Sequence, residues 1–321
     1  MIAGGVLARV LGTARRLAYY FVLLVLANLV MYALVNYAPG NPFQSAVSTE
    51  ELEGELQKLF NLDKPFATRF ALWFLSALAF DFGPSLSIQL GRPVFEMIGW
   101  PFVYTVLTVC AALVLAFLGA AFVSIVLRPD GPLGAALRPL IVVWSAVPAY
   151  LLCYWTVQGL NRVIESWVTE GFLEAPGWYP LPQTETGLVP YALAAVVLAV
   201  GDATLGDLLR GVERELSVLS GRRYIHSARA RGASVVRHAA AEFSVFATGA
   251  FAGRLVFLLG GVVIVEMLFS LSGAGALLWE AAEVRDYTVV MGVTYLSTLV
   301  VIAAMFLSDL HQYLIDPRVG T

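Results

Sequence analysis

The residues best placed for a specific task form one short basic segment that lies between two long apolar stretches. It reads Tyr224-Ile225-His226-Ser227-Ala228-Arg229-Ala230-Arg231-Gly232-Ala233-Ser234. Gly232 is suited to ending a helix in a left-handed conformation, and Ser234 can then cap a second helix that begins near Val235. The small side chains would let a partner surface approach closely. The segment therefore predicts a helix, a break and a second helix that dock on another protein.

Residues with the spacing of known catalytic or metal sites are missing from this sequence. There is no phosphate-binding G-x-x-x-x-G-K-[ST], no H-E-x-x-H, no G-x-S-x-G and no Cys-x-x-Cys. The three histidines, His226, His238 and His311, lack the spacing of metal ligands, and Cys110 and Cys153 lie inside apolar stretches, as buried thiols do. We therefore expect no catalytic residue, metal site or cofactor in this chain.

Three ionisable residues, Asp202, Arg254 and Glu266, fall inside apolar stretches. A charge at the centre of a bilayer costs at least ~2.5–3.5 kcal/mol, so such groups face the protein interior, a water path or a partner. Arg254 and Glu266 would lie about 18 Å apart along one helix and could not pair. Glu266 has two interpretations of equal weight: a hydrogen bond between helices, or a role in a transport pathway or gate.

The composition indicates an integral membrane protein built from helices. Of the 321 residues, 59% are hydrophobic and only 13% are charged, against roughly 25% charged residues in soluble domains. A helix needs about 20 apolar residues to cross the hydrocarbon. Six stretches qualify, at about 17–37, 102–127, 140–160, 189–209, 244–269 and 287–315. We expect an all-α fold with six transmembrane helices in a single domain, 1–321.

The distribution of basic residues predicts the orientation of these spans. With an uncleaved first span and the N-terminus inside, thirteen arginines fall in cytoplasmic segments and six arginines and lysines fall outside. Basic residues favour the cytoplasmic side. Both termini are therefore expected in the cytoplasm, and the docking segment lies in a cytoplasmic loop, 213–243.

The external segment at 38–101 is expected to contain two helices. Ser48 and Glu51 have the spacing of a capping box, and leucines follow at helical intervals. A second amphipathic helix should begin at Pro65. Its apolar side would carry Phe66, Phe70, Trp73 and Phe74. These helices could lie on the membrane surface or pack over the spans.

A second external loop is expected at 161–188, rich in glutamate and aromatic residues. Tryptophan and tyrosine favour the boundary between water and lipid. The loop could be an interfacial belt with a solvated acidic face, or a surface that meets an external partner or substrate.

Short motifs in a fixed order resemble a known family over nearly the whole chain. They are Ala38-Pro39-Gly40-Asn41-Pro42, Asn61-Leu62-Asp63-Lys64-Pro65, Asp81-Phe82-Gly83, Arg92-Pro93-Val94, Ser145-x-x-Pro148, the segment from Tyr224 to Gly232, Val265-Glu266-x-x-Phe269-Ser270, Gly273-x-Gly275, Arg285-Asp286-Tyr287 and Asp316-Pro317-Arg318. The chain resembles the permease subunits of bacterial ABC importers for dipeptides, oligopeptides and nickel, specifically the first of the two permeases in such systems.

The resemblance implies the fold of a type I importer permease in the bacterial cytoplasmic membrane, surrounded by lipid. It also implies a second, related permease, two ATPase subunits that bind ATP and Mg, and an external substrate-binding protein; nucleic acid is not expected. The residues that would dock on the ATPase are Tyr224, Ile225, His226, Ser227, Ala228, Arg229, Arg231, Gly232 and Ser234. Ser145, Pro148, Asp202 and Glu266 are the candidates for a transport pathway or gate.

Four residues depart from the pattern of this family. Arg223 stands where an acidic residue is usual, Glu242 where asparagine is usual, and Phe246 and Ser272 where prolines are usual. These departures fit an unusual ATPase partner or a specialised substrate.

Other functions remain open on the sequence. The cargo could be a peptide, nickel or another small solute. An ion-coupled secondary transporter would need ionisable groups along the midplane, and usually internal repeats; the sequence has only scattered charges. An intramembrane enzyme would need catalytic pairs that are missing here.

Overall fold

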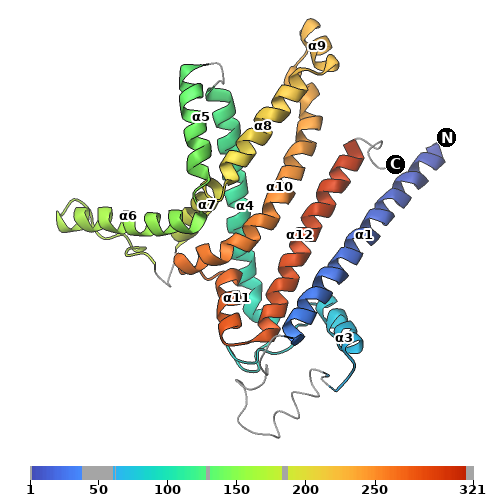
Figure 1. The fold of residues 1–321 in the computed structure, drawn as a ribbon, viewed down its shortest axis with the longest axis vertical. Helices are drawn as coiled ribbons and strands as arrows, with labels where there is room; N and C mark the ends of the chain where they lie inside the picture. The colour runs from blue at the N-terminus through green and yellow to red at the C-terminus, as the bar shows by residue number, and fades with distance from the viewer. Residues whose placement is uncertain (1, 38–60, 62, 128–130, 183–186, 316–321) are drawn as a thin grey trace. The chain divides into compact units, whose positions relative to one another are not determined.

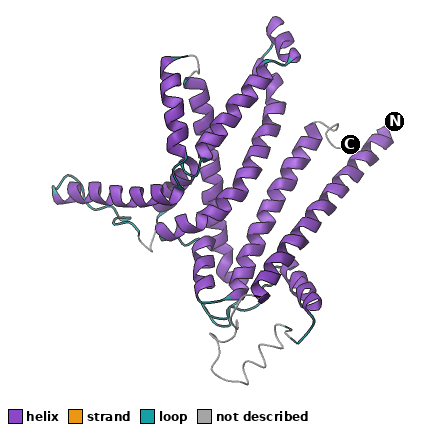
Figure 2. Ribbon diagram, viewed as in Figure 1, coloured by secondary structure: helices purple, strands orange, loops and turns teal. Residues whose placement is uncertain are grey.

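The structure is a computed structural model, and it describes all residues except 1, 38–60, 62, 128–130, 183–186 and 316–321. Every regular element in the described part of the chain is a helix (Figures 1 and 2). The helices are α1 (Ile2–Tyr37), α3 (Phe66–Leu78), α4 (Val94–Val126), α5 (Pro132–Ser145), α6 (Ala149–Thr169), α7 (Leu188–Val200), α8 (Thr204–Ser220), α9 (Arg223–Ala230), α10 (Val235–Leu268), α11 (Ala274–Glu283) and α12 (Tyr287–Ile315). The all-α fold is confirmed.

Among the residues that the structure describes, four helices are long and apolar enough to cross a membrane as single elements. They are α1, α4, α10 and α12, which cover the predicted first, second, fifth and sixth spans. Two further spans are possible if the pairs α5–α6 and α7–α8 each cross as one bent unit. The helices thus accommodate the six predicted spans.

The predicted spans at 140–160 and 189–209 differ from the structure in one respect, because each is broken. The axes of α5 and α6 meet at 96° and those of α7 and α8 at 54°. Pro148 caps α6 and has no N–H to continue a helix from α5. In the second break Asp202 and Ala203 adopt φ of 51° and 59°, which a right-handed helix cannot include.

The chain divides into two compact units. One comprises 1–105 with 272–306, and the other comprises 106–271 with 307–321, so that α4 and α12 contribute residues to both. The single permease domain expected over 1–321 stays a prediction, and each unit is described by itself below.

In the first unit, α3 packs on the membrane helices through aromatic side chains. Tyr32 of α1 lies 5.7, 5.6 and 5.3 Å from the rings of Phe66, Phe70 and Trp73, measured between centroids. Tyr295 of α12 lies 6.5 Å from Phe74. The helix predicted after Pro65 is confirmed, and it packs over spans. The helix predicted from Ser48 lies outside the described residues.

A buried carboxylate, Asp286, joins two distant segments of the first unit. Its Oδ2 accepts hydrogen bonds from the Ser85 hydroxyl and the backbone N–H groups of Leu86, Ser87 and Ile88, at 2.5–3.1 Å. Burial raises the pKa of this carboxyl, but the hydrogen bonds outweigh burial and hold the pKa below its usual value. Asp286 therefore fixes the segment before α4 against the start of α12.

In the second unit, α6 extends into the region predicted as an external loop. The loop was expected to begin at Asn161, but α6 continues to Thr169. The Asn161 side chain donates to the Leu181 carbonyl (2.6 Å) and accepts from the Leu181 N–H (2.9 Å). This pair of bonds folds the connection back onto α6, so the segment predicted as the second external loop is partly helical.

Candidate functional site

The predicted docking segment forms a compact turn between two long helices. α8 ends at Ser220, α9 spans Arg223–Ala230, and α10 begins at Val235, so that α9 lies where α8 and α10 meet (Figure 1). The cytoplasmic loop predicted at 213–243 is therefore mostly helical. Its irregular residues are the two short connections on either side of α9.

Gly232 ends α9 as the sequence predicts. Its φ is +68°, and its N–H bonds to the Arg229 carbonyl at 3.0 Å. The N–H of Ala233 bonds to the Ala228 carbonyl at 2.9 Å, which completes a Schellman motif. A Cβ at Gly232 would meet no atom within 4 Å, so the demand for glycine comes from the backbone conformation.

Ser234 begins the next helix, which confirms the second half of the local prediction. Its hydroxyl oxygen accepts a hydrogen bond from the Arg237 N–H at 3.4 Å, and the helix starts at Val235. The direction of the chain between α9 and α10 is thus fixed by one glycine and one cap.

The structure separates the nine candidate docking residues into two groups. Ile225 and Ala228 are 1% and 0% exposed, so they hold α9 against the rest of the chain. The others are exposed: Tyr224, His226, Ser227, Arg229, Arg231, Gly232 and Ser234. A partner would contact this second group, whereas the expected close contact at Ala228 is made within the chain.

Glu242 of α10 connects α10 to the start of α9. Its carboxylate accepts hydrogen bonds from Arg222 (2.7 Å) and from the Tyr224 hydroxyl (2.5 Å). The bond from Tyr224 to the carboxylate favours the protonated phenol and raises its pKa to about 12. Glu242, one of the departures from the family pattern, therefore takes part in positioning the docking helix.

Phe246, a second departure, packs where α8 and α10 lie close together. A Cβ built at Gly211 of α8 would lie only 3.0 Å from the Phe246 ring. The aromatic residue occupies the space that the missing side chain leaves. Ser272 is exposed, and nothing in the structure explains its presence there.

Three of the four pathway candidates meet where the two bent helix pairs break. The Asp202 side chain accepts a hydrogen bond from the Ala149 N–H at 2.9 Å, at the start of α6 directly after Pro148. The Ala203 N–H bonds to the Ser145 carbonyl at 2.6 Å. The breaks thus satisfy each other's backbone groups, as a membrane interior requires. We call these contacts the polar joint.

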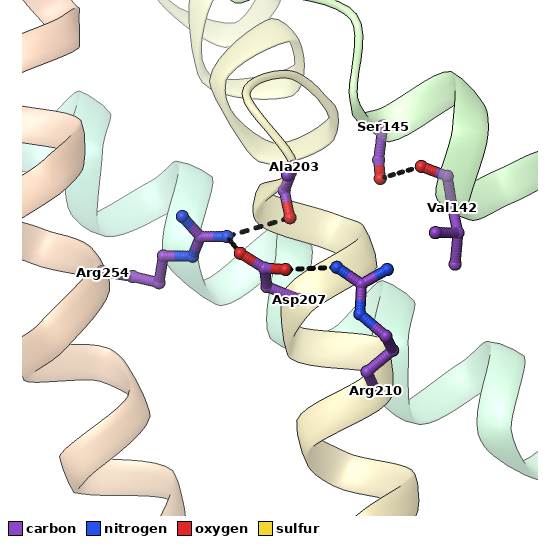
Figure 3. Close-up of polar contacts among 6 residues, drawn as sticks. All are labelled: Val142, Ser145, Ala203, Asp207, Arg210 and Arg254. Atoms are coloured by element: carbon purple, nitrogen blue, oxygen red, sulfur yellow. Dashed lines mark hydrogen bonds and ion pairs between the residues drawn. The ribbon is translucent and has the colours of Figure 1, made fainter.

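Arg254 of α10 also binds this joint (Figure 3). Its guanidinium donates to the Ala203 carbonyl at 2.9 Å and forms an ion pair with Asp207 of α8. Asp207 pairs with Arg210 as well, at 2.5 Å. Arg254 is one of the ionisable residues predicted inside a span, whereas Asp207 was not predicted to take part. The available signal was an acid inside the predicted fourth span and a base inside the fifth.

Glu266, the fourth pathway candidate, lies near the end of α10 and is 1% exposed. A Cβ built at Gly261, five residues earlier on α10, would lie 3.7 Å from the Asp202 carboxylate, so α10 approaches the polar joint at that position. At 3.6 residues per turn, Glu266 points about 140° away from Gly261. The burial fits both interpretations of Glu266.

In the residues that the structure describes, no group of three or more His, Cys, Asp and Glu side chains is arranged to hold a metal ion. His311 instead contacts the hydroxyls of Ser244 (3.3 Å) and Thr248 (3.2 Å) on α10.

Comparison with known proteins places the chain in one family. Residues 112–321 match the binding-protein-dependent transport system inner membrane component. The chain is 28% identical to the dipeptide transport system permease protein DppB of Bacillus subtilis, over 92% of this chain and 93% of that protein. It is 26% identical to the "Probable peptide ABC transporter permease protein y4tP" of Sinorhizobium fredii, over 95% and 97%. The chain therefore belongs to the family of binding-protein-dependent transport system inner membrane components.

Proposed function

We propose that this chain is the membrane permease subunit of a peptide importer that separate ATPase subunits drive. The observation that carries the proposal is the geometry of α9: a short exposed helix held at the meeting point of α8 and α10, with a Schellman motif and a serine cap fixing its direction. Family membership and the names of the relatives support transport of peptides over nickel or an ion-coupled mechanism.

The proposed assembly contains a second, related permease, two ATPases that bind ATP and Mg, and an external substrate-binding protein. The family description, which names transport dependent on a binding protein, supports the last of these. Arginine is concentrated in the termini and in alternate connections between the predicted spans, and basic residues favour the cytoplasmic side. This distribution supports an orientation with both termini and α9 inside.

The proposed mechanism is alternating access. Closure of the ATPases on ATP moves α9, and the spans then open toward the outside. α8 and α10 connect α9 to the polar joint, where Arg254 of α10 binds Ala203 and Asp207 beside the break before α8. A displacement of α9 would therefore reach both bent helix pairs through contacts between described residues.

The function is tested by reconstituting the complete complex in lipid vesicles with its binding protein. Loaded binding protein should stimulate ATP hydrolysis and peptide uptake together, while the purified chain alone should hydrolyse no ATP. Hydrolysis by the isolated chain, or uptake by vesicles that contain no ATPase subunit, would refute the proposal.

A further inference from the structure

The surface around α9 carries positive charge in an unusual concentration. Residues 216–241 contain five arginines and neither aspartate nor glutamate. The arginines are Arg222, Arg223, Arg229, Arg231 and Arg237, and all are exposed. Basic residues favour the cytoplasmic side in general. A solvated surface nevertheless usually mixes both signs of charge, and it is the missing acids that call for an explanation.

Nearby acids offset only part of this charge, and one of them, Glu215 of α8, lies close enough to Tyr224 to contribute to raising its pKa. Glu242 is engaged with Arg222 and Tyr224, and Glu213 of α8 pairs with Arg138. Within the described part of the chain, Arg223 and Arg229 form no ion pair, and the Arg231 Nε donates to the Ser227 carbonyl of its own helix.

We propose that Arg223, Arg229 and Arg231 form a cationic docking face that fits an acidic groove on the partner ATPase subunit. This inference rests on the proposed function and adds the chemistry of the surface that receives α9. Charges of opposite sign across an interface steer association and reject wrong partners. The arginines would therefore decide which ATPase this permease accepts.

The length of α10 favours a protein partner over anionic lipid. If the predicted span at 244–269 fills the hydrocarbon, the helix from Val235 to Phe243 extends about 13 Å beyond it, at 1.5 Å per residue. The headgroup layer is only about 5–8 Å thick on each side. α9 then lies past the headgroups.

The buried face of α9 points to the same conclusion. A helix that lies on a membrane inserts its apolar side chains between lipids. Ile225 and Ala228 of α9 are instead packed inside the chain, the exposed Tyr224 is hydrogen-bonded to Glu242, and Ala230 is the remaining exposed apolar side chain of this helix. α9 therefore offers a partner mainly polar and charged side chains.

Charge reversal in the reconstituted permease tests the inference. Arg223→Glu and Arg229→Glu should each weaken binding of the ATPase subunits about ten-fold or more, because like charges then face each other across the interface. Added salt should weaken ATPase binding by the wild type. It should have a smaller effect on the double variant that combines Arg223→Glu with Arg229→Glu. Arg214→Glu is the matched control, since Arg214 is exposed on α8, outside α9, and should bind normally.

Two further arms separate the possible failures. Gly232→Val disturbs the direction of α9 without changing its charge, so it tests docking itself. If Gly232→Val abolishes binding while both charge reversals bind normally, the cationic face is refuted and the proposed function stands. If all three bind normally, α9 is not the docking element.

The variants are also compared in discs of zwitterionic lipid and of mixed anionic lipid. A loss of ATPase binding that is confined to anionic discs would show that the arginines contact lipid and would overturn the inference.

Discussion

The hydroxyl of Tyr224 donates a 2.5 Å hydrogen bond to the carboxylate of Glu242, which also accepts a bond from Arg222. The first turn of α9 is thereby attached to α10, eighteen residues later in the chain. The contact is exposed and weak in isolation. Its consequence is positional, because Glu242 holds the start of α9 while Gly232 sets its end.

The titration of Tyr224 should report this contact. Glu242 raises the phenol pKa to about 12 from the usual 10. The stabilisation that this hydrogen bond gives the folded protein is therefore fully present below pH 10 and is lost as the pH rises toward 12. We expect Glu242→Gln to return the pKa toward 10, measured as the ultraviolet difference between each protein and its Tyr224→Phe derivative. Equal titration with and without Glu242 would show that the bond does not form.

The contacts of Arg254 with the polar joint make its removal a test of that joint. Arg254→Met keeps the apolar stem but removes the donors to Ala203 and Asp207. Losing hydrogen bonds to a charged group costs roughly 1.5–3 kcal/mol each. The thermal midpoint of the purified complex should fall, and transport per ATP hydrolysed should fall with it.

Arg214→Met is the control for Arg254, because Arg214 is an exposed arginine on α8 that makes no ion pair among the described residues. It should leave both the midpoint and the coupling ratio unchanged. An Arg254→Met complex as stable and as well coupled as the control would remove the polar joint from the mechanism.

Glu266 is tested by substitutions that separate shape from charge. Glu266→Gln keeps the volume of this 1% exposed side chain and removes its charge. If Glu266 belongs to the pathway or gate, uptake should fall by about ten-fold or more in the glutamine variant. A ten-fold fall corresponds to about 1.4 kcal/mol of lost stabilisation of the transport step. A hydrogen bond that only packs helices would leave uptake nearly intact in the glutamine variant. Wild-type uptake by Glu266→Ala would end the functional interpretation.

The orientation of the chain can be measured by labelling single cysteines in intact cells. Cys110 and Cys153 are first replaced by alanine, and a cysteine is then placed at Glu174 or at Ser234. The arginine asymmetry predicts that an impermeant thiol reagent labels position 174 from outside and reaches position 234 only after permeabilisation. Labelling of position 234 in intact cells would reverse the proposed topology.

Features set by neighbouring residues were predictable from the sequence. The end of α9 at Gly232, the cap at Ser234 and the helix after Pro65 each depend on a few adjacent side chains, and all three are confirmed. Apolar length was enough to find the regions of the spans, because crossing a bilayer requires it.

Features set by distant residues were not predictable in this way. Asp286 binds backbone groups around Ser87, about 200 residues away. The break at Asp202 is stabilised by a hydrogen bond from the Ala149 N–H, at the break between α5 and α6, to the Asp202 carboxylate. Hydropathy alone could not show these breaks, since apolar composition continues across them, although Pro148 inside the predicted span at 140–160 was a local signal for the first break. The burial of Ala228 was equally hidden, because small residues suit both a partner surface and the interior of one chain.

The central claim, that α9 couples this permease to a separate ATPase, is tested most directly by the ratio of peptide uptake to ATP hydrolysis in Gly232→Val. At φ of +68° a branched side chain costs on the order of 1–2 kcal/mol and redirects α9. Gly171→Val is the matched control, because Gly171 has a φ of +75° and open space around it, and it lies after α6, outside the docking segment. We predict that Gly232→Val loses ATPase binding or hydrolyses ATP without uptake, while Gly171→Val binds the ATPase subunits normally. Normal coupling in Gly232→Val would contradict the account.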